Sequence, residues 1–140
     1  MAEIWDPLRR KNVALTPEEG VRQWFIRILN EELRIPLHKM MSEVGMQFGE
    51  DVGGLAGEKR KTWRADIVAY GRQEEPLLVV ECKRPETDLT REVLEQALRY
   101  NSVLGVRFLA VTNGTRTFFC RRDGEQFVFL DRAPLWEEMI

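Results

Sequence analysis

The run Leu77-Leu-Val-Val-Glu-Cys-Lys83 constrains this chain most, because it begins as a buried β-strand and ends in charged residues. Side chains alternate between the two faces of a strand, so Glu81 and Lys83 project to one side and Cys82 to the other. Burying a charge without a partner is costly. The strand therefore brings a carboxylate and an ammonium group to one place, where both need a partner or a function.

A second strand-like segment, Arg64-Ala-Asp-Ile-Val-Ala-Tyr70, precedes the first one and carries Asp66. The polar link Gly71–Pro76 between the two segments is short enough for an antiparallel hairpin. We therefore expect neighbouring strands that bring Asp66 close to Glu81 and Lys83.

Two acids and a lysine on adjacent strands are typical of a metal-dependent phosphodiesterase site. Mg²⁺ prefers hard oxygen ligands and binds through one or two carboxylates, which Asp66 and Glu81 supply. Lys83 would position or help deprotonate the attacking water and offset charge on the phosphate. The alternative is structural: Asp66 pairs with Arg64 or Lys83, and Glu81 forms an ion pair at a strand end. Such short spacings are common, so the spacing alone leaves both interpretations open.

Composition predicts a single soluble globular domain over residues 1–140, with 44% apolar and 31% charged residues. No apolar run approaches the ~20 residues of a membrane span, and the start of the chain lacks a signal-peptide pattern. We therefore expect a cytoplasmic protein without a membrane partner. The two cysteines, Cys82 and Cys120, lie in apolar segments and are expected to be reduced and buried. Zinc would need four ligands at short paired spacings, which the chain lacks.

The formal net charge of −2 does not indicate a general nucleic-acid-binding surface, because such domains commonly carry a basic excess. Any surface that binds a phosphate backbone must be local. The candidate clusters are Arg9-Arg10-Lys11, Lys59-Arg60-Lys61 with Arg64, and Arg121-Arg122. Clusters of this size are usually solvated loops.

The hydrophobic pattern predicts the element order αβββαβββ. The first helix begins at Thr16-Pro17-Glu18-Glu19, with an N-cap and a capping box, and is expected to end at Pro36. A second helix is expected from about Leu89 to Leu104, and a glycine-rich loop over Gly49–Lys61. The predicted strands are Val44–Phe48, Trp63–Tyr70, Leu77–Lys83, Arg107–Thr112, Thr115–Cys120 and Phe127–Leu130. A strand-helix-strand crossover favours parallel pairing, so we expect an α/β fold (α+β mixed sheet) flanked by helices.

Several segments together resemble a known family. They are Arg64–Tyr70, Pro76–Lys83, Leu94–Asn101, Val111–Gly114, and the openings Asp6–Lys11 and Leu15–Gln23. They look like the N-terminal nuclease domain of type I restriction enzyme R subunits, a branch of the PD-(D/E)xK superfamily, and like short stand-alone bacterial members. The resemblance covers nearly the whole chain. It implies a restriction-endonuclease-like core and a Mg²⁺-dependent endonuclease acting on DNA, with Mn²⁺ as a substitute ion.

The resemblance also implies roles for individual residues of the triad. Asp66 and Glu81 would be metal ligands, the Cys82 carbonyl a further ligand, and Lys83 the catalytic lysine. Gln96 and Tyr100 match the family's Gln-x-x-x-Tyr element, which is thought to support DNA handling and the nuclease site.

An acid from the first helix commonly completes the metal and water network in this family, and Glu18 and Glu19 both match it. Helical geometry puts Glu18 closer to the apolar face, whereas Glu19 is the better capping-box residue, so the sequence does not decide between them. Glu43, just before the first predicted strand, would either join the site or cap a strand end.

The chain also departs from the R subunits. The 140 residues contain no Gly-Lys-Ser/Thr phosphate loop, so the ATP-driven motor of R subunits is not expected here. The loop Gly49–Lys61 looks longer than in relatives, which concerns access of substrate rather than chemistry. The expected partners are DNA and other restriction-system subunits. Two rival hypotheses remain: a catalytically weak binding or regulatory subunit, and an oligomerisation domain such as a homodimer using Phe118-Phe119 and Pro134-Leu-Trp136.

Overall fold

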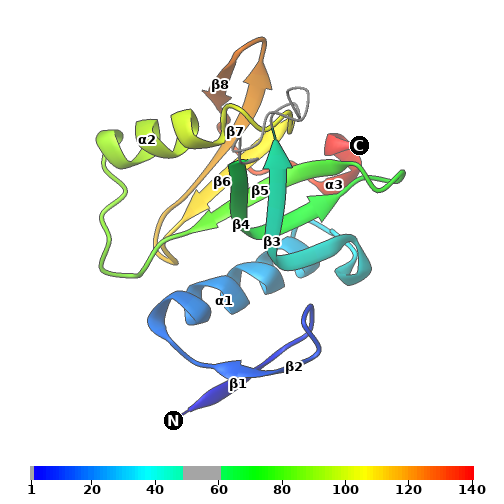
Figure 1. The fold of residues 1–140 in the computed structure, drawn as a ribbon, viewed down its shortest axis with the longest axis vertical. Coiled ribbons are helices and arrows are strands. Elements are labelled where there is room, and N and C mark those ends of the chain that lie inside the picture. Colours follow the sequence, from blue (N-terminus) through cyan, green and yellow to red (C-terminus); the bar gives the residue numbers. More distant parts are fainter. Residues whose placement is uncertain (1, 49–60) are drawn as a thin grey trace, which may run out of the picture.

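The computed structural model describes residues 2–48 and 61–140 of the chain. Within these residues the core elements follow the predicted order αβββαβββ (Figure 1). They are α1 (Pro17–Glu31), β3 (Met40–Phe48), β4 (Lys61–Tyr70), β5 (Pro76–Cys82), α2 (Arg91–Asn101), β6 (Phe108–Thr112), β7 (Thr117–Asp123) and β8 (Gln126–Phe129). Most of the predicted glycine-rich loop, and the Lys59-Arg60 part of its basic cluster, lie outside the described residues.

The six strands form one mixed sheet in the order β3-β4-β5-β6-β7-β8. Every neighbouring pair is antiparallel except β5 and β6, which are parallel and are joined through α2. The predicted crossover is therefore confirmed, as is the antiparallel pair that carries Asp66 and Glu81 on β4 and β5.

Two apolar cores cover the two faces of this sheet. Alternating residues of β5 divide between them, because Leu78 and Val80 pack with α1 whereas Val79 packs with α2. The side chains from α1 include Phe25 and Leu29, and those from α2 include Leu94 and Ala97. The two cores therefore exclude water from both faces of β4 and β5, the strands that carry the charged residues.

The first helix begins as predicted but ends earlier. Thr16 caps it, with its hydroxyl accepting a hydrogen bond from the Glu19 N–H at 3.1 Å. The helix ends at Glu31, before Pro36, because Arg34 takes a left-handed conformation with φ of 63°. The Ile35 N–H then returns to the Leu29 carbonyl at 3.0 Å, which closes the helix end.

Two elements are present that the sequence pattern did not predict. A hairpin of β1 (Glu3–Asp6) and β2 (Lys11–Ala14) forms a separate two-stranded sheet, and α1 lies between it and the main sheet (Figure 1). A short helix, α3 (Trp136–Met139), follows β8. No helix in the described ranges is long and apolar enough to cross a bilayer.

The aromatic residues considered for an oligomer interface are packed within the chain. Phe119 is buried in the core on the α1 side, and Trp136 packs against the same core and donates its indole N–H to the Tyr70 carbonyl at 3.2 Å. Phe118 packs against the opposite core. Both cysteines are free and buried, as predicted.

One expected phosphate-binding cluster contains a structural residue. Arg122 donates to the carbonyls of Ser102, Leu104 and Val106 at 2.9, 2.6 and 3.0 Å, just beyond the end of α2. Its guanidinium also lies 4.7 Å from the centre of the Phe127 ring. Arg122 therefore holds the chain between α2 and β6, and only Arg121 of this pair is exposed.

Replacing Arg122 by Gln should lower the free energy of unfolding by about 2–3 kcal/mol, because carbonyl groups lose charge-assisted hydrogen bonds. The matched exposed variant Arg121→Gln should change it by less than ~0.5 kcal/mol. Urea denaturation of both variants measures the difference. Equal stabilities for the two would show that the Arg122 hydrogen bonds do not hold this connection.

Candidate active site

Asp66 and Glu43 lie at a break in the ladder between β3 and β4. The pairs Ser42↔Ile67 and Val44↔Ala65 flank this point, and Glu43 has a left-handed φ of 52°. Ile67 packs on the α1 side and Ala65 on the α2 side, although residues two apart on a strand normally share a face. The break in alternation turns Asp66 toward α1.

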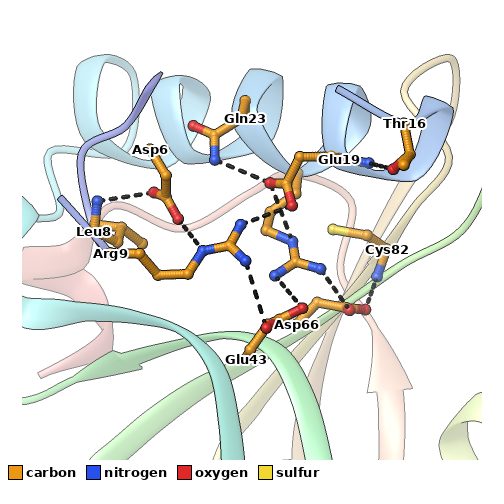
Figure 2. A network of polar contacts seen from close by, with 10 residues as sticks. Asp6, Leu8, Arg9, Thr16, Glu19, Gln23, Glu43, Asp66 and Cys82 are labelled. Atoms are coloured by element: carbon orange, nitrogen blue, oxygen red, sulfur yellow. Dashed lines mark hydrogen bonds and ion pairs between the residues drawn. The ribbon is translucent and has the colours of Figure 1, made fainter. Parts of the chain in front are cut away.

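The Asp66 carboxylate is mostly buried and is fixed from two sides. Its Oδ2 accepts a hydrogen bond from the Cys82 N–H at 2.6 Å, and its Oδ1 lies 3.6 Å from Nη2 of Arg22 (Figure 2). Burial raises the pKa of Asp66, the Cys82 N–H and the Arg22 charge lower it, and the carboxylates of Glu18 and Glu81 raise it further. The net pKa is raised, because burial outweighs the two contacts that lower it.

Glu81 and Lys83 form the ion pair that the same-face spacing predicted. Lys83 Nζ lies 3.1 Å from Glu81 Oε1, and the two side chains are 33% and 24% exposed. The Lys83 N–H donates to the Thr112 carbonyl at 2.7 Å, which holds the backbone beyond the end of β5. The ion pair that the structural alternative expects for Glu81 is present and leaves its metal-binding role a prediction, whereas the ion-pair partner of Asp66 is Arg22 rather than Arg64 or Lys83.

The structure distinguishes Glu18 from Glu19. Glu19 is buried, and its carboxylate accepts hydrogen bonds from Arg9 at 2.7 Å and Gln23 at 3.0 Å. Glu18 is half-buried, and within residues 2–48 and 61–140 it has no hydrogen bond or ion pair, yet its charge acts on Asp66. Glu18 is therefore the acid of the first helix that is available to the site.

Helix α2 contributes a residue that the sequence analysis missed. Asn101 is buried, and its Nδ2 donates to the Ala97 carbonyl at 2.8 Å and lies 3.5 Å from Glu81 Oε2. It occupies the same buried face of α2 as Leu94 and Ala97. An asparagine within this apolar stripe is the feature of the sequence that could have identified it as a site residue.

The Gln-x-x-x-Tyr pair lies on the exposed part of α2. Gln96 is exposed, and in the part of the chain that is described it makes no hydrogen bond. Tyr100 is 45% exposed. The structure shows no direct bond from Gln96 to the acids, so its role remains a prediction.

A chain of ion pairs connects the β1–β2 hairpin with Asp66 and was not predicted. Arg9 binds Asp6, which is fully buried, together with Glu19 and, at 3.4 Å, Glu43 (Figure 2). Arg22 contacts Glu19, Glu43 and Asp66 at 3.6, 3.4 and 3.6 Å. Arg9, expected in a solvated basic cluster, is therefore a structural residue.

Cys82 contributes its backbone to the site rather than its thiol. Burial raises the pKa of this thiol well above its usual value, and the Asp66 carboxylate adds to the effect. Burial likewise raises the pKa of Cys120 to about 11. Both thiols therefore stay protonated and unreactive near neutral pH. Whether the Cys82 carbonyl binds a metal remains a prediction.

The acids suit a hard ion that keeps water ligands. No group of three or more His, Cys, Asp or Glu residues among those described is arranged to hold a metal alone. Mg²⁺ needs only one or two carboxylates besides water and substrate oxygens. Asp66 and Glu81 could meet this need, because the Glu81 charge is close enough to raise the pKa of Asp66. Zinc sites use three or four protein ligands, most often His or Cys side chains, and the two acids do not provide such a set.

Comparison with known proteins bears on this arrangement. A solved fragment assigned as an HsdR subunit of a type I restriction enzyme from Vibrio vulnificus YJ016 has a similar structure, with a TM-score of 0.60 and 20% sequence identity. The match covers 91% of this chain and 25% of that one, so this chain spans about a quarter of the length of the solved fragment. It confirms the predicted fold class. No curated protein matches the sequence.

The model of the family described as "Type I restriction enzyme R protein N terminus (HSDR_N)" matches residues 17–134, which run from the start of α1 to just before α3. The match includes every strand of the main sheet. It also includes Asp66 on β4 and Glu81 near the end of β5. The chain therefore belongs to the family of type I restriction enzyme R protein N-terminal domains.

Proposed function

We propose that this domain is a Mg²⁺-dependent phosphodiesterase of the endonuclease type, acting on DNA within a restriction system. The observation that carries the proposal is the ion pair of Lys83 with Glu81 at the end of β5, beside the neighbouring strand β4 that carries Asp66, whose pKa the Glu81 charge raises. Membership of the R-protein family supports the same chemistry. DNA and other restriction subunits are the proposed partners.

In this proposal Asp66 and Glu81, with the Cys82 carbonyl, hold the ion. The ion would act as a Lewis acid at a phosphate oxygen and make water a better nucleophile. Lys83 places its positive charge where the phosphate gains negative charge, and Glu81 holds that ammonium group at 3.1 Å. Asn101 orients Glu81 through the other carboxylate oxygen, Oε2.

Glu18 is proposed as the third acid, through water or directly. It has no hydrogen-bonding partner within the described residues, and its charge is close enough to Asp66 to raise the pKa of that carboxyl group. The neighbouring Glu19 is held by Arg9 and Gln23 and serves the internal ion-pair chain instead.

Purified protein should nick supercoiled plasmid or degrade single-stranded DNA with Mg²⁺ or Mn²⁺. Glu81→Gln and Lys83→Met should each reduce the rate by about 100-fold or more, because each removes charge that acts in the transition state. Glu95→Gln is the matched control, since Glu95 pairs with Arg91 on the exposed part of α2. It should cleave at the wild-type rate.

The outcomes separate the proposal from its rival. Cleavage that survives in Glu81→Gln would contradict the assigned site. Absence of cleavage by wild type, with Mn²⁺ binding lost in Glu81→Gln, would favour the binding or regulatory subunit, which keeps the acids without turnover.

Replacing Glu18 should affect metal binding and cleavage, whereas replacing Glu19 should affect stability. Glu18→Gln should weaken Mn²⁺ binding and cleavage while changing the free energy of unfolding by less than ~0.5 kcal/mol. Glu19→Gln should lower the free energy of unfolding by about 2–3 kcal/mol, because a buried arginine loses its charged partner. Calorimetric Mn²⁺ titration and urea denaturation of each variant measure both effects. Loss of Mn²⁺ binding in Glu19→Gln alone would reverse the assignment.

The raised pKa of Asp66 predicts a pH-dependent cost in the metal-free protein. The folded state holds the Asp66 proton more tightly than the unfolded state, so stability decreases as pH rises from 3.8 through the raised pKa. Asp66→Asn lacks this cost and should be more stable than wild type near neutral pH with EDTA. The difference should vanish below pH 3.8, where both residues are uncharged.

Urea denaturation across the acid range, with and without Mn²⁺, measures this effect. Saturating Mn²⁺ should stabilise wild type and leave Asp66→Asn unchanged. A metal-free Asp66→Asn that is less stable than wild type near neutral pH would show that the ion pair with Arg22 outweighs the burial of Asp66.

A further inference from the structure

Arg22 is a buried charge surrounded by carboxylates that it does not hydrogen-bond. Its side chain is 6% exposed, and its three ion-pair distances, to Glu19, Glu43 and Asp66, are 3.6, 3.4 and 3.6 Å. These exceed the 2.7–3.2 Å typical of N–H···O hydrogen bonds. Nε and Nη1 are buried without a hydrogen-bond partner among the described residues. The guanidinium is therefore held mainly by charge, as a bound cation would be.

Arg9 shows the contrasting arrangement within the same cluster. It donates short hydrogen bonds to Asp6 and, at 2.7 Å, to Glu19, in the way that arginine usually binds carboxylates. Both arginines approach Glu43 at 3.4 Å, but only Arg22 approaches Asp66. Arg22 is thus the cation that stands next to the site.

The terminal nitrogens of Arg22 face one carboxylate oxygen from each of the two strands that meet at the break in the ladder, β3 and β4. Asp66 Oδ1 is provided by β4, and Glu43 Oε1 by the residue of β3 with the left-handed φ of 52°. Strained backbone persists where surrounding contacts hold it, and it clusters at functional sites. Here the strain places a second carboxylate opposite Asp66, with Arg22 between them.

We propose that Arg22 is a built-in cation that occupies the place of a second divalent ion beside Asp66 and so limits the domain to one divalent ion. This inference rests on the proposed function, in which Asp66 and Glu81 hold a metal. Two-metal phosphodiesterase sites place their ions ~3.5–4 Å apart. In this domain Asp66 Oδ1 faces Arg22 and Oδ2 accepts the Cys82 N–H at 2.6 Å.

Arginine suits this role because it keeps its charge at every physiological pH. A fixed charge in contact with Asp66 repels a second ion from the Glu43 side and leaves the Glu81 side open. Arg22 is a positioning residue in this account, because it contacts Asp66 and Glu43 and not the substrate.

Calorimetric titration with Mn²⁺, checked by the loss of free-ion signal in electron paramagnetic resonance, tests the inference. Wild type should bind one Mn²⁺ per chain, and Arg22→Met, which removes the charge but keeps a long side chain, should bind two. Arg22→Lys should restore binding of one. Arg9→Met is the matched control: it removes a charge from the same cluster without touching Asp66 and should still bind one.

Thermal denaturation gives a readout independent of cleavage. Mn²⁺ should raise the Tm of Arg22→Met more than that of wild type, because an ion replaces the missing charge among Glu19, Glu43 and Asp66. If Arg22→Met is unfolded without metal, saturating Mn²⁺ should refold it. A variant that stays unfolded with Mn²⁺, or that binds one ion, would overturn the inference.

The wild-type titration separates this inference from the proposed function. Two Mn²⁺ ions bound per wild-type chain would overturn the role of Arg22 and leave the metal-dependent function intact. Absence of Mn²⁺ binding by wild type, in the presence and absence of DNA, would overturn the proposed function and with it the inference.

Discussion

The contact between Arg22 and Asp66 is the interaction on which the rest of the site depends. It joins α1 to β4 at the point where the side chains of β4 stop alternating regularly between the two faces of the sheet. Removing the Arg22 guanidinium would leave Asp66 and the buried Glu19 without this positive charge, and an uncompensated buried charge costs more than the pair contributes. Glu43, Asp66 and Glu19 all contact this guanidinium, so the position of α1 over the sheet and the geometry of the acids are set together.

Much of the fold follows from periodicity and local chemistry that the sequence displays. The apolar face of α1, its Thr16 cap and the buried run of β5 predicted the order αβββαβββ and the parallel β5–β6 pair. The hairpin β1–β2 was missed because four-residue strands with mostly exposed side chains have no clear period. The end of α1 was misplaced because a left-handed Arg34, rather than the proline, closes the helix.

The site was predictable to a different extent. Alternation along one strand predicts that Glu81 and Lys83 meet, and the structure shows them 3.1 Å apart. Contacts of Arg9, Arg22 and Asn101 with the acids connect residues from different elements, so spacing in the sequence does not reveal them. A charged or amide side chain on a buried helix face was the available signal, since such groups are rarely buried without a partner. The choice between Glu18 and Glu19 needed the structure, because the capping position of Glu19 says nothing about which arginine its carboxylate meets.

The use of basic residues inside the molecule constrains how the domain would bind DNA, its proposed substrate. Arg9 and Arg22 neutralise internal acids and Arg122 holds the end of α2, so these side chains are not available to a phosphate backbone. The formal net charge is −2, and phosphate contacts supply much of the affinity of proteins for DNA. We therefore expect the isolated domain to bind DNA weakly. A divalent ion would supply part of the missing positive charge at the scissile phosphate. Sequence recognition and most of the affinity would then come from other parts of a restriction system.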